Sequence, residues 1–85
     1  MPRLKVEQKY NVQLIKIGLN VAYYRKLKGY TQEQLAEKSG LSRMTVAGIE
    51  NSDRFYSMAL GTLFKLADAL EIPIKKFFDF RDEDD

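Results

Sequence analysis

Residues 32–50 read QEQLAEKSGLSRMTVAGIE, and this stretch decides the fold. It contains two short amphipathic segments separated by a two-residue turn that begins with Gly40. Thr31 and Gln34 form a capping-box pattern at the start of the first segment, and Ser42 can cap the second. Gly40 can adopt the positive φ that a sharp turn requires. The pattern therefore predicts two helices that pack face to face and leave the second helix with one free face.

Upstream of this pair, the sequence predicts a helix over residues 11–28 that Gly29 ends. At 100° per residue its apolar positions form two stripes on nearly opposite sides, so we expect the helix to be covered on both sides. The first stripe is Leu14, Ile17, Val21 and Tyr24, and the second is Val12, Ile15, Leu19, Tyr23 and Leu27. The second stripe packs either against Phe77, Phe78 and Phe80 of the same chain or against a partner chain, and the sequence does not decide between these.

Downstream, Ser57 is the expected cap of a fourth helix, and Pro73 suits the first position of a short fifth helix. The fourth helix carries Leu60, Leu63, Leu66, Ala67 and Leu70, and the fifth carries Ile74, Phe77 and Phe78. No stretch alternates with a period of two long enough to predict a strand. The prediction is a compact all-α domain of five helices over residues 11–78, with an N-terminal extension over 1–10 and an acidic tail over 79–85.

Composition narrows the class of function. Eighty-five residues form one domain, and 45% hydrophobic residues suffice for a small core. The chain has no Cys and no His, which removes disulfides, the usual zinc ligands and the usual general base. We therefore expect no enzyme, no metal and no cofactor. No signal peptide and no apolar run of about 18 residues is found, so the sequence predicts a soluble, cytoplasmic protein.

Charge is distributed unevenly along the chain. Residues 1–30 carry seven Lys or Arg and one acid, whereas residues 79–85 carry five acids and one Arg. The basic front permits a polyanion partner, although a solvated surface explains the same charges. Arg3, Lys5 and Lys9 form either an arm that meets DNA or an ordinary frayed terminus. The tail lacks the spacing of a calcium loop, so we expect it to be solvated and to point away from DNA.

The combined pattern resembles the Cro and phage-repressor (XRE-type) helix-turn-helix family over about residues 18–78. The matching residues are Gln32, Leu35, Ala36, Gly40, Ser42, Val46 and Glu50, followed by Leu63, Leu66, Ala67 and Leu70. The resemblance implies a lambda-repressor-like domain of a bacterial or phage transcription regulator, most readily a repressor. It implies a homodimer that places the third helix in the major groove of double-stranded DNA. Without the flanking matches, a plain αα-hairpin would explain the helix pair equally well.

The resemblance also assigns residues to DNA contacts. Gln32, at a helix N-terminus, is expected on a phosphate. The free face of the third helix contains Arg43, Met44, Ala47, Gly48 and Asn51, with Ser42 and Thr45 beside it and Arg54 following it. Arg43 can bond guanine O6 and N7 together, whereas Met44 either touches a thymine methyl or is only an exposed gap-filler. Ala47 and Gly48 offer no polar side chain, so either the helix lies unusually close to the bases or DNA shape supplies discrimination.

Arg25 and Glu50 match family members in which these positions form a structural ion pair, although two unrelated surface charges are the simpler alternative. A second function also fits the sequence. The sparse reading face and the second apolar stripe suit an antitoxin or adaptor, a protein-interaction module with weak DNA binding. Salt dependence of binding to duplex DNA separates the two functions.

Overall fold

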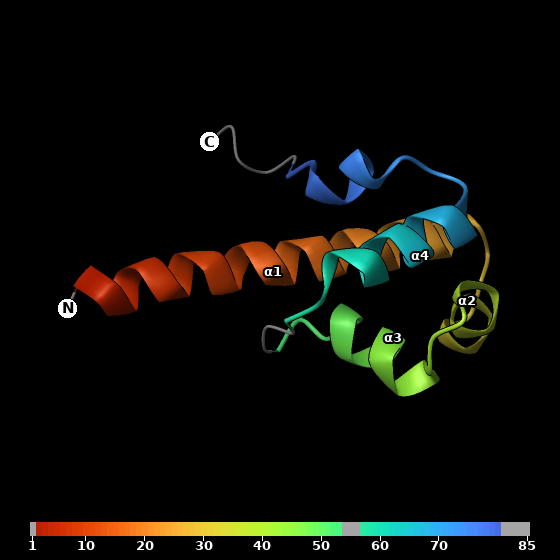
Figure 1. Ribbon diagram of the computed structural model, residues 1–85, viewed down its shortest axis with the longest axis horizontal. Helices are drawn as coiled ribbons and strands as arrows, with labels where there is room; N and C mark the ends of the chain where they lie inside the picture. Colours follow the sequence, from red (N-terminus) through yellow and green to blue (C-terminus); the bar gives the residue numbers. More distant parts are fainter. Residues whose placement is uncertain (1, 54–56, 81–85) are drawn as a thin grey trace.

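The structure, a computed structural model, describes residues 2–53 and 57–80, with side chains described from Tyr10 onward. Arg54 and the acidic residues 82–85 therefore lie outside the described residues. The described residues contain four α-helices and one 3-10 helix and no strand (Figure 1). The elements are α1 (Pro2–Leu27), α2 (Gln32–Ser39), α3 (Arg43–Glu50), α4 (Leu60–Leu70) and the 3-10 helix η1 (Ile74–Phe78). The predicted all-α class is confirmed.

The first helix begins earlier than the sequence predicted. α1 starts at Pro2, nine residues before the expected start, and so includes most of the predicted N-terminal extension. Proline is favourable at a first helical position, and the Leu, Lys, Glu and Gln residues that follow it are good helix formers. The expected end is right, because Gly29 follows the helix with φ 78°.

The fourth and fifth elements also differ from the prediction. Ser57 does not cap α4, whose N-cap is Ala59 without any side-chain hydrogen bond. α4 ends at Leu70, and the C-cap residue Glu71 takes the left-handed conformation at φ 60° although it has a side chain. Its carboxylate lies 2.8 Å from the ammonium of Lys28, which joins the ends of α1 and α4. The fifth helix lies where expected but is a five-residue 3-10 helix, the form typical of such short pieces.

α1 is the element around which the others pack. It contacts α3, α4 and η1, and the α2–α3 pair and η1 lie on opposite sides of it (Figure 1). The core consists of Ile17, Val21, Leu35, Ala36, Val46, Ile49, Leu63, Leu66, Ala67, Leu70 and Phe77. Every element contributes to this list, so α3 is fixed to a single core on its inner side.

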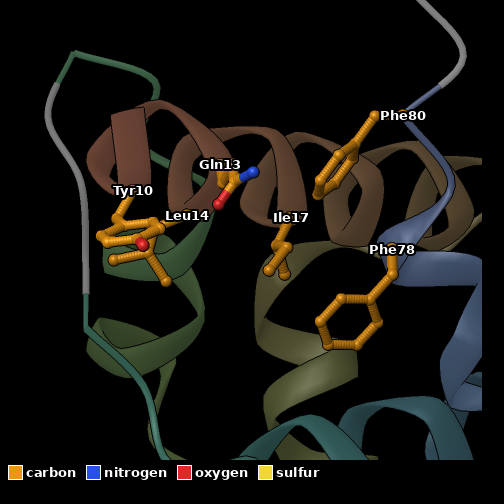
Figure 2. Close-up of a pocket in the computed structure, with 6 residues that line it drawn as sticks. All are labelled: Tyr10, Gln13, Leu14, Ile17, Phe78 and Phe80. Atoms are coloured by element: carbon orange, nitrogen blue, oxygen red, sulfur yellow. The ribbon is translucent and has the colours of Figure 1, made fainter. Parts of the chain in front are cut away.

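The C-terminal segment is fastened to α1 by one buried amide. Asn20 donates hydrogen bonds to the carbonyls of Phe77, at 2.9 Å, and Asp79, at 3.1 Å. Beyond it, an open cavity of about 450 Å³ lies between α1 and the segment (Figure 2). Its lining is Tyr10, Gln13, Leu14, Ile17, Phe78 and Phe80. Phe78 and Phe80 therefore lie beside Leu14 and Ile17 of the first apolar stripe of α1, and the core that also contains Phe77 buries Val21 of the same stripe.

The described chain does not cover the second stripe of α1, so the first of the two alternatives, packing against phenylalanines of the same chain, is not found. Phe77, Phe78 and Phe80 pack on the other side of the helix. The exposed fractions are 49% for Val12, 47% for Leu19, 45% for Tyr23 and 66% for Leu27. Within the part of the chain that the structure describes, none of the helices has the length and apolar character to cross a membrane.

Candidate nucleic-acid interface

The start of α2 and the turn after it have the geometry that the sequence predicted. Thr31 Oγ1 accepts from the Gln34 backbone N–H at 3.0 Å, and Gln34 Oε1 accepts from the Thr31 N–H at 2.8 Å. Gly40 adopts φ 75°, and the Leu41 N–H closes the turn on the Ala36 carbonyl at 3.0 Å. Reciprocal capping and the left-handed glycine fix both ends of α2, so the direction in which α3 leaves the turn is determined.

α3 begins with a side-chain cap. Ser42 Oγ accepts from the Thr45 backbone N–H at 3.0 Å and lies 2.9 Å from the Thr45 hydroxyl. Val46 and Ile49 are buried on the inner side of the helix. The helix is therefore fixed both at its start and along its inner face, and its outer face is left for a partner.

A close contact between α1 and α3 escaped the sequence reasoning. A Cβ placed on Gly18 would lie 1.9 Å from the Ile49 carbonyl oxygen, far inside van der Waals contact. Only glycine lets the two backbones approach so closely at this point. A glycine inside an otherwise helical pattern was the available signal, since such a residue commonly marks a packing contact.

A buried network ties the end of α3 to α1. Glu50 Oε2 accepts from Arg25 Nε at 2.7 Å, and Oε1 accepts from Arg25 Nη2 at 2.9 Å. The third guanidinium nitrogen, Nη1, donates to the Tyr30 carbonyl at 2.6 Å. The Arg25 and Glu50 side chains are only 11% and 4% exposed, so solvent screens the pair weakly. The structure thus brings these two predicted residues together in a bidentate ion pair.

Gln32 belongs to the same network, which the sequence reasoning missed. Its Nε2 donates to Glu50 Oε1 at 3.0 Å, and the residue is half-buried. One of its two amide hydrogens is thereby used inside the protein, and the other is left for a ligand. The start of α2 and the end of α3 are therefore linked through one carboxylate.

The outer face of α3 has few polar groups. Arg43 and Met44 are exposed, with Met44 82% exposed, whereas Ala47 and Gly48 are half-buried. Asn51 is exposed and its Oδ1 accepts from the Asp53 backbone N–H at 2.9 Å. Arg43 is the one cation of α3, and the helix contains no acid before Glu50. The face therefore presents one charged donor at its N-terminal end and a smooth, small-residue surface behind it.

This arrangement of capped helices, tight turn and outward third helix defines a DNA-binding helix-turn-helix domain. A family profile described as Helix-turn-helix (HTH_3) matches residues 21–77. The chain belongs to this XRE-type helix-turn-helix family and is a DNA-binding transcriptional regulator. Its fold is therefore that of DNA-binding regulators rather than that of an enzyme family.

Individual relatives agree with this assignment. The chain is 39% identical to an HTH-type transcriptional regulator of Methanocaldococcus jannaschii over 62 residues, 73% of this chain and 91% of the relative. The restriction-modification controller protein C.AhdI of Aeromonas hydrophila matches with a TM-score of 0.71 and 38% identity, covering 76% of this chain and 96% of that one. SinR, the master regulator for biofilm formation, was solved in complex with DNA. It matches with a TM-score of 0.68 and 30% identity, covering 74% of this chain and 98% of that one.

Proposed function

We propose that this protein is a sequence-specific repressor that binds a two-fold site in double-stranded DNA as a homodimer in the cytoplasm. Each copy lays the outer face of α3 in the major groove, with half-sites about 34–36 Å apart. The proposal depends on one observation, the way in which α3 is held against the rest of the domain. Its inner side is buried, its end is bound by Arg25, and its outer residues Arg43 and Met44 are exposed.

Base recognition in this proposal is concentrated at the start of α3. Arg43 bonds the O6 and N7 acceptors of a guanine, and Met44 lies against a thymine methyl. The small Ala47 and Gly48 let the helix approach the bases closely but read none of them through polar side chains. We therefore expect a short directly read sequence, with further discrimination from the shape of the DNA.

Contacts to the phosphate backbone position α3 in the groove. The free N–H groups at the start of α2 and the remaining amide hydrogen of Gln32 bind one phosphate. Ser42, Thr45, Asn51 and Arg54 complete the backbone contacts on either side of α3. Because Gln32 also bonds Glu50, a phosphate held there is connected through one carboxylate to the helix that reads the bases.

The test compares Arg43→Ala with Gln32→Ala over a panel of duplexes that differ at single base pairs. We expect Arg43→Ala to cost about 1–3 kcal/mol and to relax the preference at one base pair. Gln32→Ala should weaken all duplexes about equally, because phosphates carry no sequence information. Lys65→Ala, an exposed charge removal on α4, is the matched control and should change neither. Equal behaviour of the first two variants across the panel would contradict these roles.

A second candidate function is a protein-interaction module, such as an antitoxin or adaptor. The exposed apolar stripe of α1 favours it, and the related SinR has also been solved in complex with the SinI protein. A regulator that neutralises Z phosphates loses DNA affinity with a log–log salt slope of about −0.9Z. A flat salt dependence together with a tight protein partner would favour the adaptor.

A further inference from the structure

We propose that the sulfur of Met44 is a modification site, at which a peroxide oxidises the free protein and thereby weakens its binding to DNA. The co-reactant belongs to the class of two-electron oxidants, of which hydrogen peroxide is the simplest. The effect on DNA binding rests on the proposed function, whereas the reactivity of Met44 itself does not.

Met44 is openly accessible to small solutes. Among the exposed large hydrophobic side chains in the described part of the chain, it has the highest exposed fraction, 82%. It lies in the first turn of α3, next to Arg43 on the outer face of the helix. A dissolved oxidant can therefore reach the thioether without any movement of the fold.

The chain offers an oxidant few other targets. It contains no Cys and no Trp, and its three methionines are Met1, Met44 and Met58. Met58 is half-buried and packs against the core. Met1 lies outside the described residues. Because oxidation of sulfur follows exposure, Met44 should react before Met58.

The reaction needs only the thioether and the peroxide. A lone pair of the Met44 sulfur attacks one oxygen of hydrogen peroxide, the O–O bond breaks, and an S–O bond forms. The proton on the transferred oxygen passes to the departing oxygen, which leaves as water. Sulfur is thereby oxidised by two electrons and the peroxide is reduced by two. The product, methionine sulfoxide, is polar where the thioether was apolar, and dedicated reductases reverse the change.

The new oxygen would stand where the proposed interface needs an apolar group. In the proposed function Met44 lies against a thymine methyl, so a sulfoxide there would be buried without a hydrogen-bond donor. Burying a polar group without such a partner costs free energy. Ala47 and Gly48, behind it on the same face, have no polar side chain that could bond the oxygen. Oxidation of Met44 therefore weakens the contact with DNA directly.

The fold does not depend on the Met44 side chain. α3 is held through the buried Val46 and Ile49 and through its cap at Ser42. In the free protein the sulfoxide oxygen stays in water, where it costs nothing to solvate. We therefore expect thermal unfolding to be the same before and after oxidation, which separates a loss of DNA binding from a loss of structure.

The first experiment follows the oxidation of each methionine by peptide mass mapping during a time course with hydrogen peroxide. We expect Met44 to gain an oxygen at least about fivefold faster than Met58. A duplex that the wild-type protein selects from a random pool should slow the reaction of Met44, because the proposed interface covers it. Faster oxidation of Met58, or no protection of Met44 by the bound duplex, would overturn the inference.

The second experiment compares affinity for that duplex before and after peroxide treatment in the wild type, Met44→Leu and Met58→Leu. Treatment should weaken binding by the wild type at least about tenfold. Met58→Leu, the matched control, should lose as much, whereas Met44→Leu should keep its own untreated affinity. Methionine sulfoxide reductases should restore the treated wild type. An equal loss in Met44→Leu, or undiminished binding by a protein whose Met44 is fully oxidised, would contradict the proposal.

Failure of this inference and failure of the proposed function give different results. If the untreated wild type binds duplex DNA in a salt-dependent way and oxidation of Met44 has no effect, the inference is wrong and the regulator function stands. If the untreated wild type shows no salt-dependent binding to any duplex, the proposed function is wrong, and with it the effect of oxidation on DNA binding. The faster reaction of Met44 is then still measured in the free protein.

Discussion

The α2–α3 pair and the α4–η1 pair are fixed to the same core by different means. α2 and α3 each begin with a side-chain cap, and Glu50 binds both α1 and α2 at the end of the pair. α4 and η1 begin without a side-chain cap. Buried apolar residues secure α4, and η1 is held by the buried Phe77 and by the hydrogen bonds that Asn20 donates to the chain at its end. Polar contacts define direction as well as distance. The difference indicates that orientation is controlled most tightly in the half that carries the proposed DNA-reading face.

The largest change in stability is expected at Gly18 in α1, where the backbone of α3 lies closest. Gly18→Ala should destabilise the fold by about 3 kcal/mol, because the new Cβ would overlap the Ile49 carbonyl and displace α3. Gly61→Ala in α4 is the matched control. It meets nothing within 4 Å and should stabilise the fold by about 0.5–1 kcal/mol. Chemical denaturation of both variants measures the difference, and similar stabilities would refute a close backbone contact.

The next largest effect is expected at Glu50. Glu50→Gln removes the charge that balances Arg25 inside a poorly solvated network, at a cost of about 2–3 kcal/mol. Glu37→Gln on the exposed side of α2 is the control and should have little effect. Thermal unfolding provides the measurement. An equally small effect at both positions would mean that polar contacts do not stabilise the α2–α3 pair more than the α4–η1 pair.

The helix starts allow a smaller and sharper test. Ser42→Ala should cost about 1 kcal/mol because it removes the cap of α3. Ser57→Ala should cost almost nothing, since α4 begins beyond it. Ala59→Ser should supply the missing cap and stabilise α4 by about 0.5–1 kcal/mol. Urea denaturation resolves these values, and a clear loss for Ser57→Ala would show that α4 begins earlier.

The smallest expected effect is the pH dependence of the exposed Lys28–Glu71 pair. The hydrogen bond from Lys28 lowers the pKa of Glu71, and the same bond raises the pKa of Lys28. A lowered carboxyl pKa adds stability above the ordinary Glu pKa, and that stability is lost as pH falls through the lowered value. A raised lysine pKa adds stability below the ordinary Lys pKa that is lost at higher pH. Wild type and Glu71→Gln should therefore differ most between these limits, as thermal melts across pH would show.

Local patterns predicted the α2–α3 pair well because its determinants are local. The capping box, the left-handed Gly40 and the cap at Ser42 all act within four residues of where they stand. The Gly18–Ile49 contact and the bond from Gln32 to Glu50 join residues far apart in the sequence, and no spacing rule reveals them. The residues that fill the free face of α3 followed from helical periodicity, whereas their DNA partners remain predictions.

The predictions were wrong or undecided where the local sequence pattern was weak or was compatible with two structures. Ser57 looked like a cap, but α4 starts three residues later, because burial of Leu63 and Leu66 and not a cap decides where this helix forms. The early start of α1 depends on the helix propensity of residues 2–9, which precede the two apolar stripes used to predict the helix. Cover of the second stripe could not be predicted, because a helical stripe facing a core and one facing another molecule have the same composition.

The double hydrogen bond from Asn20 has a practical consequence for experiments on the whole protein. It holds the chain at Phe77 and Asp79 against the side of α1 opposite the α2–α3 pair (Figure 1). A fluorescent label or a fused domain joined after Phe80 would thus start on the outer surface of the protein–DNA complex. Attachment at this end should leave DNA binding intact. An insertion between α2 and α3 would instead disrupt the helix-turn-helix on which the proposed DNA binding depends.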